Sequence, residues 1–158
     1  MSYWFSMKNG SLAHRILKAV GRRRIVRRRD LERLGGYDQV GRALRRLEEE
    51  GFLEKIDRGV WLRLGRAVGR QMHARAWSTP GGASDDKVLR LTLAQPSFDD
   101  LAALCLSLGL KRADMTLSEL RADNEISPGV ARRDEEIIAN VRAGLLRMAR
   151  ADDRSASR

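Results

Sequence analysis

The segment at residues 38–64 changes from a helical to a strand-like pattern at one glycine, and this change constrains the fold more than any other feature. Its first part, residues 38–50, has the i, i+3, i+4, i+7 apolar spacing of an amphipathic helix, at Val40, Ala43, Leu44 and Leu47. Gly51 then ends the predicted helix. The next residues, FLEKIDRGVWLRL, alternate and contain a turn at residues 57–59. They predict a β-hairpin in which Trp61 belongs to the core.

Two further helices and a pair of β-branched residues precede this helix and hairpin. Ser11 caps a predicted first helix, whose apolar positions are Leu12, Ile16, Leu17 and Val20. Ile25 and Val26 predict a brief buried strand that pairs with the hairpin, and residues 28–34 predict a second helix before a turn with two glycines. This order, over residues 9–64, is that of a winged helix-turn-helix. A small α/β domain without a nucleic-acid role is the alternative.

The second half of the chain is expected to be a mostly helical module. The small and polar stretch STPGGASDD predicts a linker, and the short apolar segment VLRLTL after it is expected to pair as a strand. The last helix is expected to begin at Pro128, with the inward residues Val130, Ile137, Ile138, Val141, Leu145 and Met148.

The fold class that we expect is mainly α, with an N-terminal winged helix-turn-helix, a small β-wing and a C-terminal helical module. The expected division is a DNA-binding domain at residues 1–76, a linker at 77–86, a helical interaction module at 87–151 and a disordered tail at 152–158.

The positive charge of the chain is concentrated in its first half. The protein carries a net charge of +10 over 158 residues. Residues 1–76 hold 19 Lys and Arg residues against 8 Asp and Glu residues, whereas residues 77–158 hold 12 against 13. This asymmetry favours a first half that binds a polyanion, although a generally basic proteome is the alternative. We see no membrane-spanning run or secretory signal, and the single cysteine cannot form an internal disulfide, so we expect a cytoplasmic protein.

The outward face of the predicted helix at residues 38–50 suits DNA. In a winged helix-turn-helix, the third helix enters the major groove and its N-terminal half meets base edges. Arg42 suits guanine and Gln39 suits adenine, whereas Gly41 allows close approach. Arg45 and Arg46 lie further along and are expected at phosphates. A solvated helix face is the alternative for all of them.

Basic residues outside this helix extend the predicted surface. Lys55 and Arg58 near the hairpin tip are expected to follow the backbone or enter the minor groove. Arg27 and Arg28 lie near the start of the second helix, where we expect phosphate contacts that add affinity. Asp38 either contacts DNA or caps its helix. The predicted DNA-binding residues are therefore Arg27, Arg28, Asp38, Gln39, Gly41, Arg42, Arg45, Arg46, Lys55 and Arg58.

The sequence shows no pattern of catalytic residues or metal ligands. His14, His73 and Cys105 are too few and too scattered for a zinc site. Cys105 falls on the apolar face of a predicted helix, so we expect a buried structural thiol. The glycine-rich stretch lacks the phosphate-loop pattern. We therefore expect no enzyme activity, no metal and no cofactor.

A series of spaced residues at positions 25–64 resembles a known family. The family pattern is a Val before a basic helix, a Leu-Gly turn, Val-x-x-Ala-Leu-x-x-Leu, Gly-x-Leu and a hairpin ending in Arg-Gly-x-Tyr. The matching residues are Val26, Leu34, Gly35, Val40, Ala43, Leu44, Leu47, Gly51, Leu53, Arg58 and Gly59. This pattern resembles the N-terminal winged helix of AbiEi-like antitoxins, from bacterial toxin–antitoxin systems often called type IV. Trp61 replaces the usual Tyr, and Arg27 stands where Ser or Thr often caps the second helix.

The resemblance implies a transcriptional autorepressor. The segments SFDDLAALCLSLGL and EISPGVARRDEEIIANVRAGL also look like the tail segments of antitoxins encoded beside nucleotidyltransferase toxins. The leading hypothesis is thus a sequence-specific regulator that binds double-stranded operator DNA and counteracts such a toxin. The alternative is a winged-helix adaptor that binds an acidic partner without neutralising a toxin. The aromatic residues Tyr3, Trp4 and Phe5 suit either a homodimer contact or the core.

Overall fold

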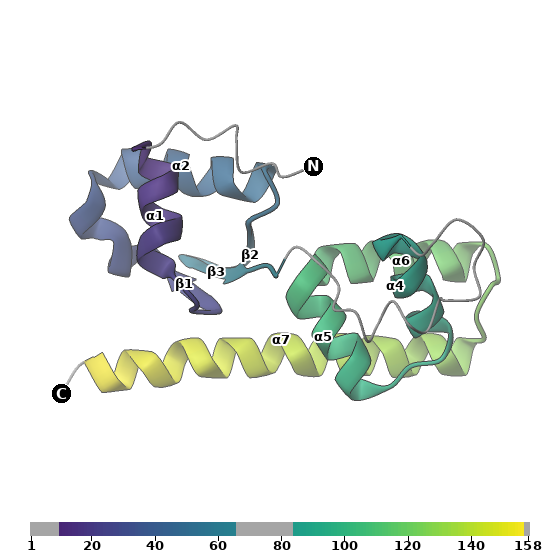
Figure 1. The fold of residues 1–158 in the computed structure, drawn as a ribbon. Helices are drawn as coiled ribbons and strands as arrows, with labels where there is room; N and C mark the ends of the chain where they lie inside the picture. Colours follow the sequence, from purple (N-terminus) through teal and green to yellow (C-terminus); the bar gives the residue numbers. More distant parts are fainter. Residues whose placement is uncertain (1–9, 66–83, 157–158) are drawn as a thin grey trace. The chain divides into compact units, whose positions relative to one another are not determined.

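The computed structural model describes residues 10–65 and 84–156, which fall into two units (Figure 1). The first unit contains the chain up to Arg63 together with the segment from Met148 onward, and the second contains Leu64–Arg147. The aromatic residues at positions 3–5 and most of the predicted linker lie outside the described residues.

The first unit is a winged helix-turn-helix, as the sequence predicts. Its helices are α1 (Leu12–Val20), the 3-10 helix η2 (Arg28–Leu34) and α2 (Tyr37–Glu49). Its strands are β1 (Ile25–Arg27), β2 (Leu53–Asp57) and β3 (Val60–Arg63), in the antiparallel order β1-β3-β2. The predicted second helix is therefore present at its expected residues, but as a 3-10 helix.

Local sequence signals explain where these elements begin and end. Ser11 caps α1, because its hydroxyl accepts a hydrogen bond from the backbone N–H of His14 at 3.2 Å. The hairpin turn places Gly59 at a φ of 71°, a conformation that suits glycine. Val26 of β1 lies opposite Trp61 of β3. The predicted pairing of the brief strand with the hairpin is therefore confirmed.

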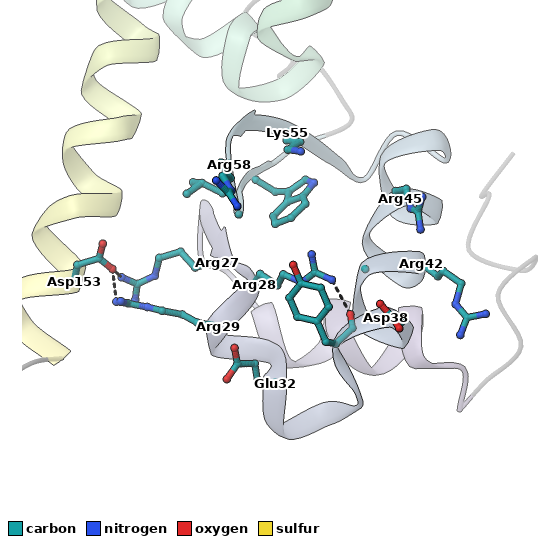
Figure 2. A pocket seen from close by; sticks show the side chains of 15 residues that line it. Arg27, Arg28, Arg29, Glu32, Asp38, Arg42, Arg45, Lys55, Arg58 and Asp153 are labelled. Atoms are coloured by element: carbon teal, nitrogen blue, oxygen red, sulfur yellow. Dashed lines mark hydrogen bonds and ion pairs between the residues drawn. The ribbon is translucent and has the colours of Figure 1, made fainter.

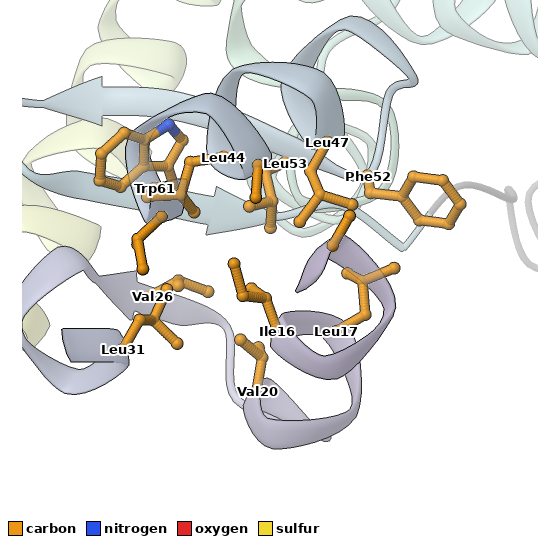
Figure 3. Close-up of a cluster of buried hydrophobic side chains, with 13 residues drawn as sticks. Ile16, Leu17, Val20, Val26, Leu31, Leu44, Leu47, Phe52, Leu53 and Trp61 are labelled. Carbon is orange, nitrogen blue, oxygen red and sulfur yellow. The ribbon is translucent and has the colours of Figure 1, made fainter. Parts of the chain in front are cut away.

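The core of the first unit lies between the helices and the sheet (Figure 3). The fully buried residues include Ile16 of α1 together with Leu44 and Leu47 of α2. Two hairpin residues, Leu53 and Trp61, pack in the same cluster. The prediction that Trp61 packs in the core is confirmed. Because the apolar stripe of α2 is fixed in this cluster, the helix turns its opposite, polar face to solvent.

The second unit is helical, with α4 (Asp85–Ala94), α5 (Phe98–Leu108), α6 (Leu110–Ala122) and the first part of α7 (Pro128–Ala156). The expected strand at VLRLTL is wrong, because this segment lies within α4. Ser84 caps that helix, accepting from the N–H of Lys87, and the buried residues fall at helical spacing: Val88, Leu89, Thr92 and Leu93. Alternation of apolar and polar residues over six positions does not distinguish a strand from one side of a short helix.

Two expectations about the last helix differ from the structure. Helix α7 continues to Ala156, through residues that we expected in a disordered tail. Met148 was expected inward, but 53% of it is exposed. A residue missed by the sequence pattern, Asp134, is instead completely buried on α7.

Among the described residues, none of the helices combines the length and apolar character needed to cross a membrane.

Candidate nucleic-acid interface

An open groove of about 1050 Å³ runs along the first unit (Figure 2). Helix α2, helix η2, the hairpin and the end of β1 line it, and the end of α7 adds one carboxylate, that of Asp153. The lining includes seven cationic residues: Arg27, Arg28, Arg29, Arg42, Arg45, Lys55 and Arg58. It includes three acidic residues, Glu32, Asp38 and Asp153. The residues that line the groove therefore carry more positive than negative charge, and they lie beside the exposed face of α2.

Eight of the ten residues that the sequence nominated for DNA binding line this groove, and two do not. Arg46 lies outside it and forms an ion pair with Glu50, with 2.8 Å between Nε and Oε1. Gln39 is exposed outside it, and its side-chain oxygen lies beside Gly35. The structure thus places Arg42 and Arg45 in one groove with the hairpin cations, whereas Gln39 and Arg46 of the same helix are not part of its lining.

The cations on the outer side of the groove are open to solvent. Arg42, Arg45 and Arg58 are exposed, and within the described ranges they form no ion pair. Lys55 is exposed on β2, and its ammonium lies 5.9 Å from the centroid of the Trp61 ring. Unpaired surface guanidinium and ammonium groups in one groove are suited to phosphate oxygens.

Arg28 is held in the middle of the groove. Its guanidinium lies 3.4 Å from the centroid of the Tyr37 ring, and its Nη2 donates a hydrogen bond of 2.7 Å to the backbone carbonyl of Tyr37. The dashed line from Arg28 in Figure 2 marks this bond. A Cβ on Gly41 would lie only 2.5 Å from the same Nη2. We expected the missing side chain of Gly41 to admit DNA, but the guanidinium of Arg28 occupies that space.

Arg27 is committed to carboxylates of the protein. Its Nε lies 3.0 Å from Oδ2 of Asp30, and its Nη1 pairs with Asp153 of α7 and donates to the carbonyl of Ala149. Only 12% of its side chain is exposed. Burial lowers the pKa of Arg27, but the hydrogen bonds and charges of Asp30 and Asp153 outweigh burial and raise it above its ordinary value. A phosphate contact by Arg27, as the sequence predicts, would require Asp153 to move.

Seven of the fifteen groove residues are not among those nominated from the sequence, and three of these bear on the site: Arg29, Tyr37 and Asp153. Arg29 pairs with Asp153 (Figure 2), and Asp153 is 126 positions away from Arg27, so no local pattern joins them. Tyr37 begins α2 and is 67% exposed. A signal was available for Tyr37, because a large aromatic residue directly after a Gly-Gly turn occupies the N-terminal end of the helix expected in the major groove.

Potential metal ligands do not cluster in the described ranges. Within residues 10–65 and 84–156, no group of three or more His, Cys, Asp and Glu residues is placed to hold a metal ion. Cys105 is completely buried, as expected for a structural thiol, and His73 lies outside the described residues.

Comparisons with known proteins do not assign the chain to a family. No family model matches its sequence, and neither the curated proteins nor the solved structures include a significant match.

Proposed function

We propose that this protein is a sequence-specific regulator of transcription that binds double-stranded DNA. The observation that carries the proposal is the cationic groove beside the exposed face of α2, within a winged helix-turn-helix. Helices in the position of α2 enter the major groove in this class of domain. Because the groove cations and α2 belong to one unit, phosphates and base edges can be contacted at the same time.

The residues divide into two roles under this proposal. Arg42, on the N-terminal half of α2, contacts a base edge, for which a guanidinium suits guanine O6 and N7. Arg45, Lys55 and Arg58 contact phosphates, and Arg58 at the hairpin tip also reaches the adjacent minor groove. Arg46 and Gln39, which lie outside the groove, are assigned smaller parts than the sequence alone gave them.

We further propose that the regulator is an antitoxin that represses its own operon and counteracts a nucleotidyltransferase-type toxin. The support for this step is the resemblance of residues 25–64 to AbiEi-like antitoxins. Expression of the product of the neighbouring gene, with and without this protein, tests it directly. Growth arrest that this protein relieves is the expected result, whereas a harmless neighbour would leave only the DNA-binding part of the proposal.

A second candidate function is an adaptor for an acidic protein. The observation in its favour is the pairing of Asp153 with both Arg27 and Arg29, because a carboxylate on a helix already occupies part of the groove. Titration with random duplex DNA at about 0.15 M salt separates the candidates. Retention of DNA supports the regulator, and binding of an acidic protein without any DNA retention supports the adaptor.

The decisive experiment is selection of binding sites from a random duplex pool, followed by affinity measurements with two matched variants. We expect Arg42→Ala to weaken binding to the selected site by about 1–3 kcal/mol and to relax the preference at one position. Arg46→Ala removes the same charge from the same helix outside the groove, so the preference should survive. A pool that yields no preferred site would contradict sequence-specific binding.

A further inference from the structure

We propose that Tyr37 determines sequence specificity by contacting the 5-methyl group of a thymine, and that Arg28 positions it for this contact. The inference rests on the proposed DNA-binding function and names a base contact within it. The groove is lined mainly by charged side chains, and Tyr37 is the residue in it that would contact an apolar group of a base.

Tyr37 combines exposure with a position in the groove. It is the first residue of α2, lines the groove and is 67% exposed. The other large apolar or aromatic residues that are exposed in the described ranges do not line the groove: Leu91, Phe98, Met115 and Met148. Because the N-terminal residues of a recognition helix meet base edges, an aromatic ring at this position lies where bases are read.

Arg28 fixes Tyr37 through two interactions with the same residue. The guanidinium covers one face of the ring at 3.4 Å from its centroid, and Nη2 is bound to the carbonyl of Tyr37 at 2.7 Å. The charge-assisted hydrogen bond to the backbone holds the guanidinium in place, and the guanidinium stacked on the ring restricts the Tyr37 side chain before DNA arrives. Less conformational freedom is then lost on binding, which raises affinity for a site that fits the fixed ring.

The guanidinium of Arg28 is already engaged with Tyr37. Its Nη2 is used by Tyr37, and its Nε is buried without a hydrogen-bond partner in the described part of the chain. A guanidinium stacked on the ring and bound to the backbone would have to leave both interactions to turn toward a base. Arg28 therefore acts as a positioning residue, and Tyr37 carries the contact.

Gly41 supplies the space that this arrangement needs. A Cβ there would lie 2.5 Å from Nη2 of Arg28 and 3.4 Å from its Cζ. Glycine inside a helix is less favourable than alanine, so the helix retains a residue that weakens it. Alanine at this position displaces only the far end of a flexible side chain, and the helix itself has no reason to unfold.

Thymine is the base whose chemistry matches the exposed part of the ring. With one face covered by the guanidinium, Tyr37 presents its other face and its edge, which are apolar apart from the hydroxyl. The thymine methyl is the apolar group that B-form DNA offers in the major groove. Removing it by exchanging thymine for uracil leaves every hydrogen-bonding group of the base pair unchanged.

The test is a uracil scan of the site selected from random duplexes, measured with the natural protein, Tyr37→Ala and Tyr37→Phe. At one position, uracil should weaken binding of the natural protein by about fourfold, the factor for one buried methyl-sized group. Tyr37→Ala should be insensitive to that exchange, and Tyr37→Phe should keep the sensitivity. If no uracil position is coupled to residue 37, or if Tyr37→Phe alone removes the coupling, the thymine contact is wrong.

Two glycine variants test whether Arg28 positions Tyr37, and one of them serves as the control for effects on folding. Gly41→Ala and Gly144→Ala both replace a helical glycine, but a Cβ at Gly144 meets nothing within 4 Å. Both variants should be at least as thermally stable as the natural protein, and only Gly41→Ala should lose the uracil sensitivity. Arg28→Ala should lose it as well. A Gly41→Ala variant that keeps the sensitivity in full would overturn the role of Arg28.

The outcomes separate this inference from the proposed function. A protein that selects no DNA sequence would refute both. A protein with a clear preferred site and no coupling between residue 37 and a thymine methyl would refute only the inference.

Discussion

Asp134 of helix α7 is completely buried, and neither of its carboxylate oxygens has a hydrogen-bond partner among the described residues. Burial away from water disfavours the charged form and raises the pKa of Asp134 to about 7, although the charge of Arg133 opposes this rise. A buried carboxyl group without partners is unfavourable to folding when it is ionised. The sequence pattern gave no warning, because Asp134 sits in a run of acidic residues that is typical of a solvated helix face.

The raised pKa predicts that acid stabilises the helical unit. Below about pH 4 the folded and unfolded states both carry the proton, and the full stability is present. Between about pH 4 and pH 7 only the unfolded state releases it, so the free energy of unfolding falls as the pH rises, by at most about 4 kcal/mol. Above about pH 7 this group adds no further pH dependence.

Asp134→Asn tests this prediction. We expect the variant to unfold at higher denaturant concentration than the natural protein at pH 8, and the difference to shrink toward pH 4. Urea titrations followed by circular dichroism at several pH values measure both effects. Glu136→Gln, an exposed neighbour on the same helix, is the matched control. Equal pH dependence in the natural protein and the Asn variant would assign the titration to another group.

Residues of the first unit show where prediction from sequence succeeds and where it stops. Trp61 could be placed in the core because alternation along a hairpin fixes which side chains face inward. Arg27 could not be placed, since its partner Asp153 belongs to another element, far away in the chain. The local charge pattern identified basic residues correctly but could not say which of them are already paired.

At the level of elements, the end of α7 has an effect on the groove that its own sequence does not suggest. Asp153 pairs with Arg27 and with Arg29, of which Arg29 is about half exposed. The pair with Arg29 is exposed and therefore weak. The pair with Arg27, whose side chain is only 12% exposed, contributes more, so removing Asp153 should lower stability modestly while Arg27 keeps Asp30. Under the proposed function, these ion pairs occupy guanidinium groups that would otherwise be open to DNA phosphates.

We therefore expect Asp153→Asn to bind DNA more tightly and with a steeper salt dependence. Arg29 then keeps only the ion pair with Asp30, at 3.9 Å. If its guanidinium contacts one more phosphate, the slope of log affinity against log salt should become more negative by about 0.9. Asp152→Asn is a close control, because it removes the same charge from the neighbouring position, which does not line the groove. Two variants with equal affinities and slopes would show that general charge, and not the ion pair, is responsible.

Periodicity predicted some elements well and others poorly. The 13-residue helix α2 was found with nearly the right ends because four apolar positions at helical spacing leave no strand alternative. The strand predicted for VLRLTL, which lies in α4, was wrong because six residues are too few to distinguish a helical from a strand-like period. The 3-10 geometry of η2 and the continuation of α7 to Ala156 depend on packing and capping, which spacing alone does not reveal.

For the whole molecule, the uneven charge has a measurable consequence. The groove contains four exposed cations without ion pairs in the described residues: Arg42, Arg45, Lys55 and Arg58. If the three assigned to phosphates, Arg45, Lys55 and Arg58, make those contacts, the slope of log affinity against log salt should be about −3. Arg45→Ala should make the slope less negative by about 0.9 and weaken all sequences alike. A slope near zero on DNA would favour the adaptor function.

The pairing of Arg27 with Asp153 also has a consequence for synthesis of the chain. The two residues are 126 positions apart, so the ribosome adds Asp153 roughly 6–25 s after Arg27 at ordinary elongation rates. During that interval Arg27 of β1 and Arg29 of η2 have been synthesised, but the carboxylate of Asp153 that pairs with them has not. The nascent winged domain therefore meets the nucleic acids around it with more free positive charge than the finished protein carries there.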